Sequence, residues 1–135
     1  MRPSVCRGNC GLMMESRTID APEILIIEDE PLIAMYIEDA LTRSGYRTAG
    51  PCETVESAVE AAHRFDGAGA LVDLMLDGSD ASEVTEILTK RNIPFIIMTG
   101  REEAALLPTG VGVPILKKPF LAGDLLETVK AVCTR

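Results

Sequence analysis

EILIIEDEP, residues Glu23–Pro31, decides the fold because an apolar run passes directly into acidic residues and a proline. A continuous apolar run of this length is typical of a strand that is buried on both faces of a sheet. Pro31 is a favoured first position of a helix, and apolar residues then recur at helical spacing until Gly45. The segment therefore predicts a buried strand at Glu23–Glu28 that leads straight into an amphipathic helix.

The same alternation of strand and helix continues toward the C-terminus. Thr54 is a suitable N-cap for a second helix, and two further helices are predicted with Leu88 and Leu125 facing inward. Pro114 indicates that the last strand lies at an edge of the sheet. Five strands alternating with helices predict an α/β fold with a parallel sheet covered on both faces. The other four strands are predicted at Tyr46–Gly50, Ala70–Leu76, Ile93–Thr99 and Val113–Lys117.

Composition limits the classes of protein to which the chain can belong. Its 135 residues, 47% hydrophobic and 25% charged, are enough for one globular domain. The net charge of −8 argues against binding to nucleic acid or to anionic lipid. No apolar run is long enough for a membrane span or a secretory signal, so the expected compartment is the cytoplasm. Residues 1–22 lack hydrophobic periodicity and are predicted to form a disordered leader, with the domain at 23–135.

Polar residues stand at the ends of four predicted strands. Because ligands of an open parallel α/β sheet bind beyond the carboxyl ends of its strands, these residues are expected to share one site. An acid at a strand end can also be the N-cap of the next helix, so Asp29 alone is ambiguous. Asp73 is less ambiguous, because apolar residues flank it on both sides and buried charges are normally paired or metal-bound. The converging residues are Glu28, Asp29, Asp73, Thr99, Lys117 and Lys118.

Together these groups predict phosphoryl transfer that depends on magnesium. Carboxylates placed close together repel one another unless a cation neutralises them, and oxygen ligands suit Mg²⁺. With a cation present, the Asp73 carboxylate is a plausible nucleophile that forms an aspartyl phosphate. Lys118 and Thr99 could then contact the phosphoryl oxygens. Lys117 is expected to be a solvated charge, because adjacent residues of a strand point to opposite sides.

The motifs around these residues resemble those of the response regulator receiver family, from about Glu23 to the C-terminus. ILIIEDEP resembles the family's first strand with its acidic pair, VDLML its phosphoacceptor segment, MTG its switch position, and KKPF its Lys-Pro pair. The resemblance implies a flavodoxin-like, doubly wound sheet with strand order 2-1-3-4-5. It also implies that Asp73 is the phosphoacceptor, that Thr99 and Lys118 assist, and that Mg²⁺ is bound by Glu28 (through water), Asp29, Asp73 and the carbonyl of Met75.

Three departures from the family pattern stand out. Asp77 occupies a position where many receivers have proline, and it is a second, less favoured candidate for the acceptor. Ile115 replaces an aromatic residue that couples to the switch threonine in many receivers. Only a short helical piece fits within 101–112, which predicts a shortened or missing fourth helix and resembles the receiver subgroup named for a PFxFATG motif. His63 is expected to be a surface residue rather than a phosphoryl carrier.

These observations predict a stand-alone receiver, since only 15 residues, enough for the last helix, follow Phe120. The resemblance implies a sensor histidine kinase or phosphotransfer protein as donor and a downstream protein as target, with the receiver acting by contact or as a phosphate shuttle or sink. Homodimer formation stays open, and no enzymatic activity is expected beyond the receiver's own phosphorylation and dephosphorylation. The alternative is a pseudo-receiver that only binds partners. A phosphatase or nucleotide-binding enzyme is disfavoured, because the chain lacks GxxxxGK[ST], GxGxxG and DxD motifs.

Overall fold

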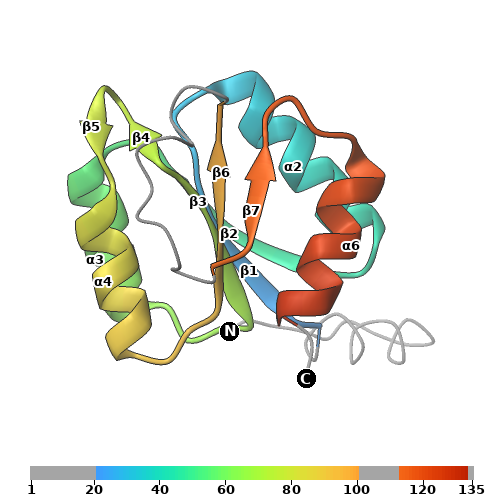
Figure 1. Ribbon diagram of the computed structural model, residues 1–135. Helices are drawn as coiled ribbons and strands as arrows, with labels where there is room; N and C mark the ends of the chain where they lie inside the picture. Colours follow the sequence, from blue (N-terminus) through green and yellow to red (C-terminus); the bar gives the residue numbers. More distant parts are fainter. Residues whose placement is uncertain (1–20, 101–112, 134–135) are drawn as a thin grey trace, which may run out of the picture.

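A five-stranded parallel sheet forms the centre of the protein (Figure 1). The computed structural model describes residues 21–100 and 113–133. The strand order is β2-β1-β3-β6-β7, which confirms the predicted order 2-1-3-4-5 for the five strands of the main sheet. It also places β7 at an edge, as Pro114 predicted. The five strands are β1 (Glu23–Ile27), β2 (Arg47–Cys52), β3 (Gly69–Asp73), β6 (Phe95–Thr99) and β7 (Ile115–Lys117).

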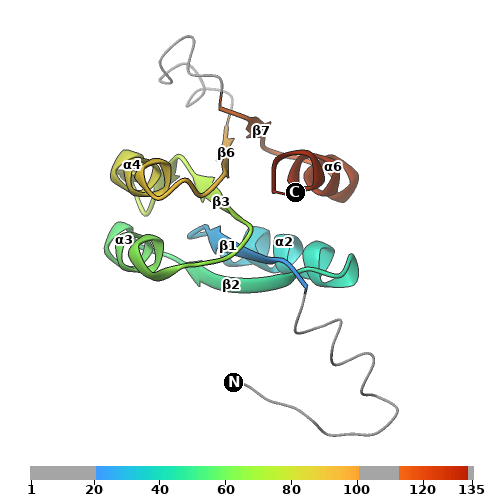
Figure 2. The ribbon, with the colours of Figure 1, turned by 90° about the horizontal axis from the view of Figure 1, so that it is seen from below.

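Among the described residues, helices cover both faces of this sheet (Figure 2). One pair is α2 (Pro31–Arg43) and α6 (Ala122–Cys133), and the other is α3 (Val55–Arg64) and α4 (Ser82–Lys90). Thr54 caps α3 as predicted, because its side chain accepts a hydrogen bond from the Ser57 N–H. No described helix combines the length and the apolar character needed to cross a membrane.

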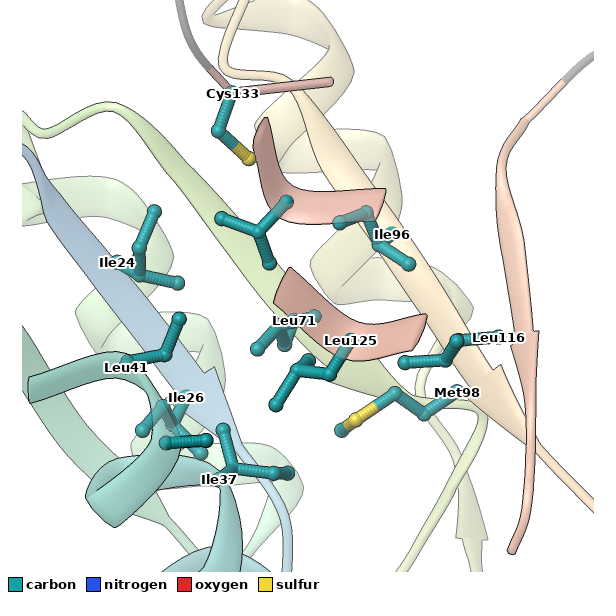
Figure 3. Close-up of a cluster of buried hydrophobic side chains, with 12 residues drawn as sticks. Ile24, Ile26, Ile37, Leu41, Leu71, Ile96, Met98, Leu116, Leu125 and Cys133 are labelled. Carbon is teal, nitrogen blue, oxygen red and sulfur yellow. The ribbon is translucent and has the colours of Figure 1, made fainter. Parts of the chain in front are cut away.

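Two apolar cores fill the space between the sheet and its helix pairs. Successive strand residues point to opposite faces, so Ile24 and Ile26 pack under α2 and α6 whereas Leu25 and Ile27 pack under α3 and α4. Figure 3 shows the first core, in which side chains of β1, β3, β6 and β7 meet those of α2 and α6. Burial on both faces explains why the sequences of the central strands are continuous apolar runs.

A small hairpin corrects the prediction of a single strand at Ala70–Leu76. The strand β3 ends at Asp73, and the next residues form β4 (Met75–Leu76), which pairs in antiparallel fashion with β5 (Ser79–Asp80). Asp77 and Gly78 both have positive φ angles, 53° and 77°, as a two-residue type I′ turn requires. The Asp77-Gly78 dipeptide is a sequence signal for such a hairpin, and the prediction of one continuous strand overlooked it.

Two predicted segments concern residues that the structure largely does not describe. The short helical piece expected within 101–112 lies outside the described residues, as does most of the predicted leader, 1–22. The last two residues of that leader do contact the domain. The carbonyl oxygens of Ala21 and Pro22 accept hydrogen bonds from the side chain and the main chain of Arg47.

Two glycines test how tightly α6 packs on the sheet. A Cβ atom at Gly69 would lie 2.3 Å from the Sγ of Cys133, whereas one at Gly123 would meet nothing within 4 Å. We therefore expect Gly69→Ala to lower the free energy of unfolding by about 1–3 kcal/mol through overpacking. Gly123→Ala, its control, should raise this free energy by up to about 1 kcal/mol through helix propensity. Urea unfolding of both variants measures the difference, and equal stabilities would contradict the packing.

Candidate functional site

Acidic side chains gather where β1 and β3 end. Ile27 pairs with Val72 in the parallel register, so the residues that follow them, Glu28 and Asp73, lie at the same level. Oxygen atoms of Glu28, Asp29 and Asp73 all lie within 4.8 Å of one another. The predicted convergence of these three acids is thus present in the structure.

Lys118, directly after β7, brings a positive charge to this cluster. Its Nζ lies 2.9 Å from Oε1 of Glu28 and 3.2 Å from Oδ2 of Asp73. The contact with Glu28 is an ion pair rather than an aligned hydrogen bond, since the buried Oε1 has no hydrogen-bond partner of suitable geometry among the described residues. The neighbouring Lys117 is exposed, as strand alternation predicted.

Burial makes the charges of this cluster strongly interdependent. Glu28 and Asp73 are only 1% and 4% exposed. The pKa of Asp73 is raised to about 7, chiefly by burial and then by the Glu28 carboxylate, and Lys118 offsets this rise only in part. Burial disfavours the charged form of Lys118, but Glu28 and Asp73 outweigh this effect, so its pKa is raised above the ordinary value. The two buried acids therefore hold Lys118 as an ammonium ion, whereas Asp73 titrates near neutral pH.

Asp29 is hydrogen-bonded to the hairpin rather than paired with Lys118. Its Oδ2 accepts a hydrogen bond of 2.9 Å from the main-chain N–H of Asp77. The Asp77 side chain is exposed, in line with its lower rank as an acceptor. The contact joins the end of β1 to a turn 48 residues away, and the sequence contained no direct signal for it.

Thr99 and Met75 complete the set of predicted site residues. Thr99 is fully buried at the end of β6, where its hydroxyl donates to the Gly100 carbonyl at 3.1 Å. Its own carbonyl accepts from the N–H of Lys118 at 2.8 Å, so the two residues are joined through the main chain. Met75 begins β4, and the role of its carbonyl as a ligand stays a prediction.

Two further residues singled out in the sequence lie on the surface. Ile115 is 43% exposed on β7, and His63 is exposed at the end of α3.

The donor set fits a hard divalent cation. Three carboxylates face one ammonium group, so the cluster has an excess of negative charge when all of its acids are ionised. Its ligand atoms are oxygens, which suit Mg²⁺ or Ca²⁺ better than softer metals. Oε1 of Glu28, buried and without an aligned donor, is an atom that a bound cation would satisfy.

Comparison with known proteins identifies the family. Residues 24–130 match the family model of the response regulator receiver domain. The chain belongs to the response regulator receiver family. Receivers act in two-component signalling, and the carboxylates of Glu28, Asp29 and Asp73 form a group that could hold a metal ion in this receiver.

Individual relatives agree with this assignment. The receiver is 31% identical over 123 residues to the sensory transduction protein RegX3 of Mycobacterium tuberculosis, an alignment that covers 83% of this chain and 51% of RegX3. It therefore spans about half the length of such curated relatives. The solution structure of SdrG from Sphingomonas melonis is 33% identical with a TM-score of 0.73, covering 82% of this chain and 95% of SdrG.

A further neighbour carries a metal ion. The receiver domain of the sensor histidine kinase PA1611 from Pseudomonas aeruginosa is 25% identical, with a TM-score of 0.74. The match covers 85% of this chain and 99% of that domain, whose structure contains a magnesium ion coordinated in the active-site cleft.

The raised pKa of Asp73 predicts a pH-dependent stability in metal-free buffer. From about pH 4, the ordinary range of an aspartate, to about pH 7, Asp73 holds its proton more firmly in the folded receiver than in the unfolded chain. The contribution of Asp73 to the free energy of unfolding should therefore fall as the pH rises through this window. Asn does not titrate, so Asp73→Asn should gain stability relative to the wild type over the same window. Urea unfolding with a chelator at several pH values tests this, and a pH-independent difference would contradict it.

Proposed function

We propose that this receiver accepts a phosphoryl group on Asp73 from a histidine kinase or phosphotransfer protein, in a reaction that requires Mg²⁺. The observation that carries the proposal is the buried Asp73 carboxylate, which lies 3.2 Å from Lys118 and within 4.8 Å of Glu28 and Asp29. A carboxylate buried among other acids destabilises the fold unless cations neutralise it, and such costly groups cluster at functional sites. This arrangement provides both a nucleophile and a place for the cation.

The transfer needs few groups, and the receiver has a candidate for each. Mg²⁺, bound by Asp29, Asp73 and the Met75 carbonyl with Glu28 assisting, would supply charge neutralisation for the phosphoryl oxygens. An oxygen of Asp73 forms the bond to phosphorus while the bond from phosphorus to the donor's histidine nitrogen breaks, and the imidazole leaves with the electron pair. The Lys118 ammonium and the Thr99 hydroxyl stabilise the charge on the transferred group.

The surface beside Asp73 is suited to contact with a protein. A groove of about 500 Å³ is bordered by Lys118 and by apolar residues of α2 and of the loop that precedes α6. Leu32 at the start of α2 and Leu121 before α6 are more than 70% exposed. Because Lys118 also contacts Asp73, a phosphodonor must approach this edge of the sheet, and exposed apolar side chains favour protein partners.

The phosphorylated receiver would pass its signal on to another protein. Phosphorylation adds negative charge and oxygen acceptors at Asp73, next to Lys118 and the strand that carries Thr99. Contact with a downstream protein, or onward transfer of the phosphoryl group, then transmits the signal from a cytoplasmic location. A homodimer is one form that such a contact could take. The acidic surface, with a net charge of −8, favours protein partners over nucleic acid.

The acceptor assignment is tested by labelling. Wild-type receiver incubated with Mg²⁺ and radiolabelled acetyl phosphate should incorporate label, and Asp73→Asn should lose it. Asp66→Asn, an exposed acid in the loop before β3, is the matched control and should be labelled like the wild type. Label retained in Asp73→Asn would exclude Asp73 as the acceptor. Absence of label and of beryllofluoride-induced NMR shifts in the wild type would instead identify a pseudo-receiver.

The two adjacent lysines give a second test. Lys118→Ala should slow labelling by about 100-fold or more, because the charge beside Asp73 is removed from a buried site. It should also destabilise the fold by about 3–5 kcal/mol in metal-free buffer, since two buried acids lose their counter-ion. Lys117→Ala removes the same charge from an exposed position and should change neither rate nor stability appreciably. Equal labelling rates for the two variants would contradict the role of Lys118.

A further inference from the structure

The hairpin that follows β3 is anchored firmly enough to position a neighbouring group. Leu76 in β4 and Ala81 after β5 are fully buried in the core beneath α3 and α4. Main-chain hydrogen bonds of 3.0 Å join Leu74 to Met98 of β6 and Ala81 back to Leu74. The turn at Asp77 and Gly78 is therefore fixed relative to the sheet, although the turn itself is exposed.

This turn directs one main-chain N–H group at the acidic cluster. The N–H of Asp77 donates to Oδ2 of Asp29 at 2.9 Å, a distance typical of a strong hydrogen bond to a carboxylate. A carboxylate oxygen has two lone pairs, so it can accept this bond and still ligate a cation. Many receivers have proline at this position, and proline has no N–H to donate.

We propose that the main-chain N–H of Asp77 positions the Asp29 carboxylate for binding of a divalent cation. The inference rests on the proposed function, because it concerns the same cation site. It assigns the role to the main chain of Asp77 and gives its side-chain charge no part in cation binding. The left-handed turn, with φ angles of 53° and 77°, is what turns this N–H toward Asp29. Asp77 is thus a positioning residue that acts through Asp29.

Gly78 and Gly45 form a matched pair for testing this role. Both have positive φ angles, and a Cβ atom at either would meet nothing within 4 Å. Valine at either position therefore introduces similar backbone strain, and its Cβ atom meets no clash. Only Gly78 lies in the turn that carries the Asp77 N–H. Gly78→Val and Gly45→Val should lower the stability to a similar extent, whereas only Gly78→Val should disturb Asp29.

The decisive measurement is Mg²⁺ affinity, determined by NMR titration of the folded receiver. Gly78→Val should weaken Mg²⁺ binding by about tenfold or more, as is typical when a group that orients a metal ligand is lost. Gly45→Val should stay within about twofold of the wild type. Asp77→Asn, which keeps the N–H and tolerates a positive φ, should also stay within about twofold. If Gly78→Val does not fold, Gly78→Ala imposes the same strain in milder form and should show a smaller loss.

A metal-free measurement checks the contact itself. Asp29→Ala removes the acceptor, so the Asp77 amide should exchange its hydrogen several-fold faster than in the wild type, without any cation present. Wild-type affinity in Gly78→Val, or weakened affinity in Asp77→Asn, would overturn the positioning role while leaving the proposed function intact. Unchanged exchange in Asp29→Ala would overturn it as well. A wild type that does not bind Mg²⁺ would exclude the proposed function and this inference together.

Discussion

The contact of one lysine with two buried carboxylates is the constraint on which the site depends. Glu28 and Asp73 occupy the ends of neighbouring strands, where water is largely excluded, and the ammonium of Lys118 is within 3.2 Å of both. Removing such charges from water is costly, and one ammonium compensates only part of the cost of two carboxylates. Burial first, and the remaining negative charge of Glu28 second, raise the pKa of Asp73 to about 7. The same imbalance makes the site receptive to a cation, because a bound cation would complete the neutralisation.

The fold supplies this contact through strand register rather than through any local motif. Glu28 follows β1, Asp73 ends β3 and Lys118 follows β7, and these strands lie in the hydrogen-bonded order β1-β3-β6-β7. The two apolar cores hold the sheet from both faces, so the positions of the strand ends are set by packing far from the site.

The sequence was sufficient to predict the sheet and the meeting of its strand ends. Apolar runs give strands, and parallel strands bring their carboxyl ends to one edge, so the proximity of Glu28, Asp73 and Lys118 follows from order alone. The hairpin at Met75–Asp80 was not predicted. An apolar run indicates a strand, but it does not show at which residue the strand leaves the main sheet and pairs with another segment. The Asp77 contact with Asp29 could not be predicted at all, since it involves a main-chain group and depends on the hairpin.

The hairpin and the edge strand reach the acidic cluster from opposite directions. The turn at Asp77 contacts Asp29, and Lys118, joined to Thr99 by a main-chain hydrogen bond of 2.8 Å, contacts Asp73 and Glu28. A change in charge at Asp73 therefore acts on both elements, because each is held by a carboxylate of the same cluster. By the reciprocity of linked equilibria, a partner that binds the hairpin or the edge strand more tightly when the cluster holds a cation would raise the affinity of the cluster for that cation by the same factor. The surfaces on which partners would act are thus coupled to the site through its charges.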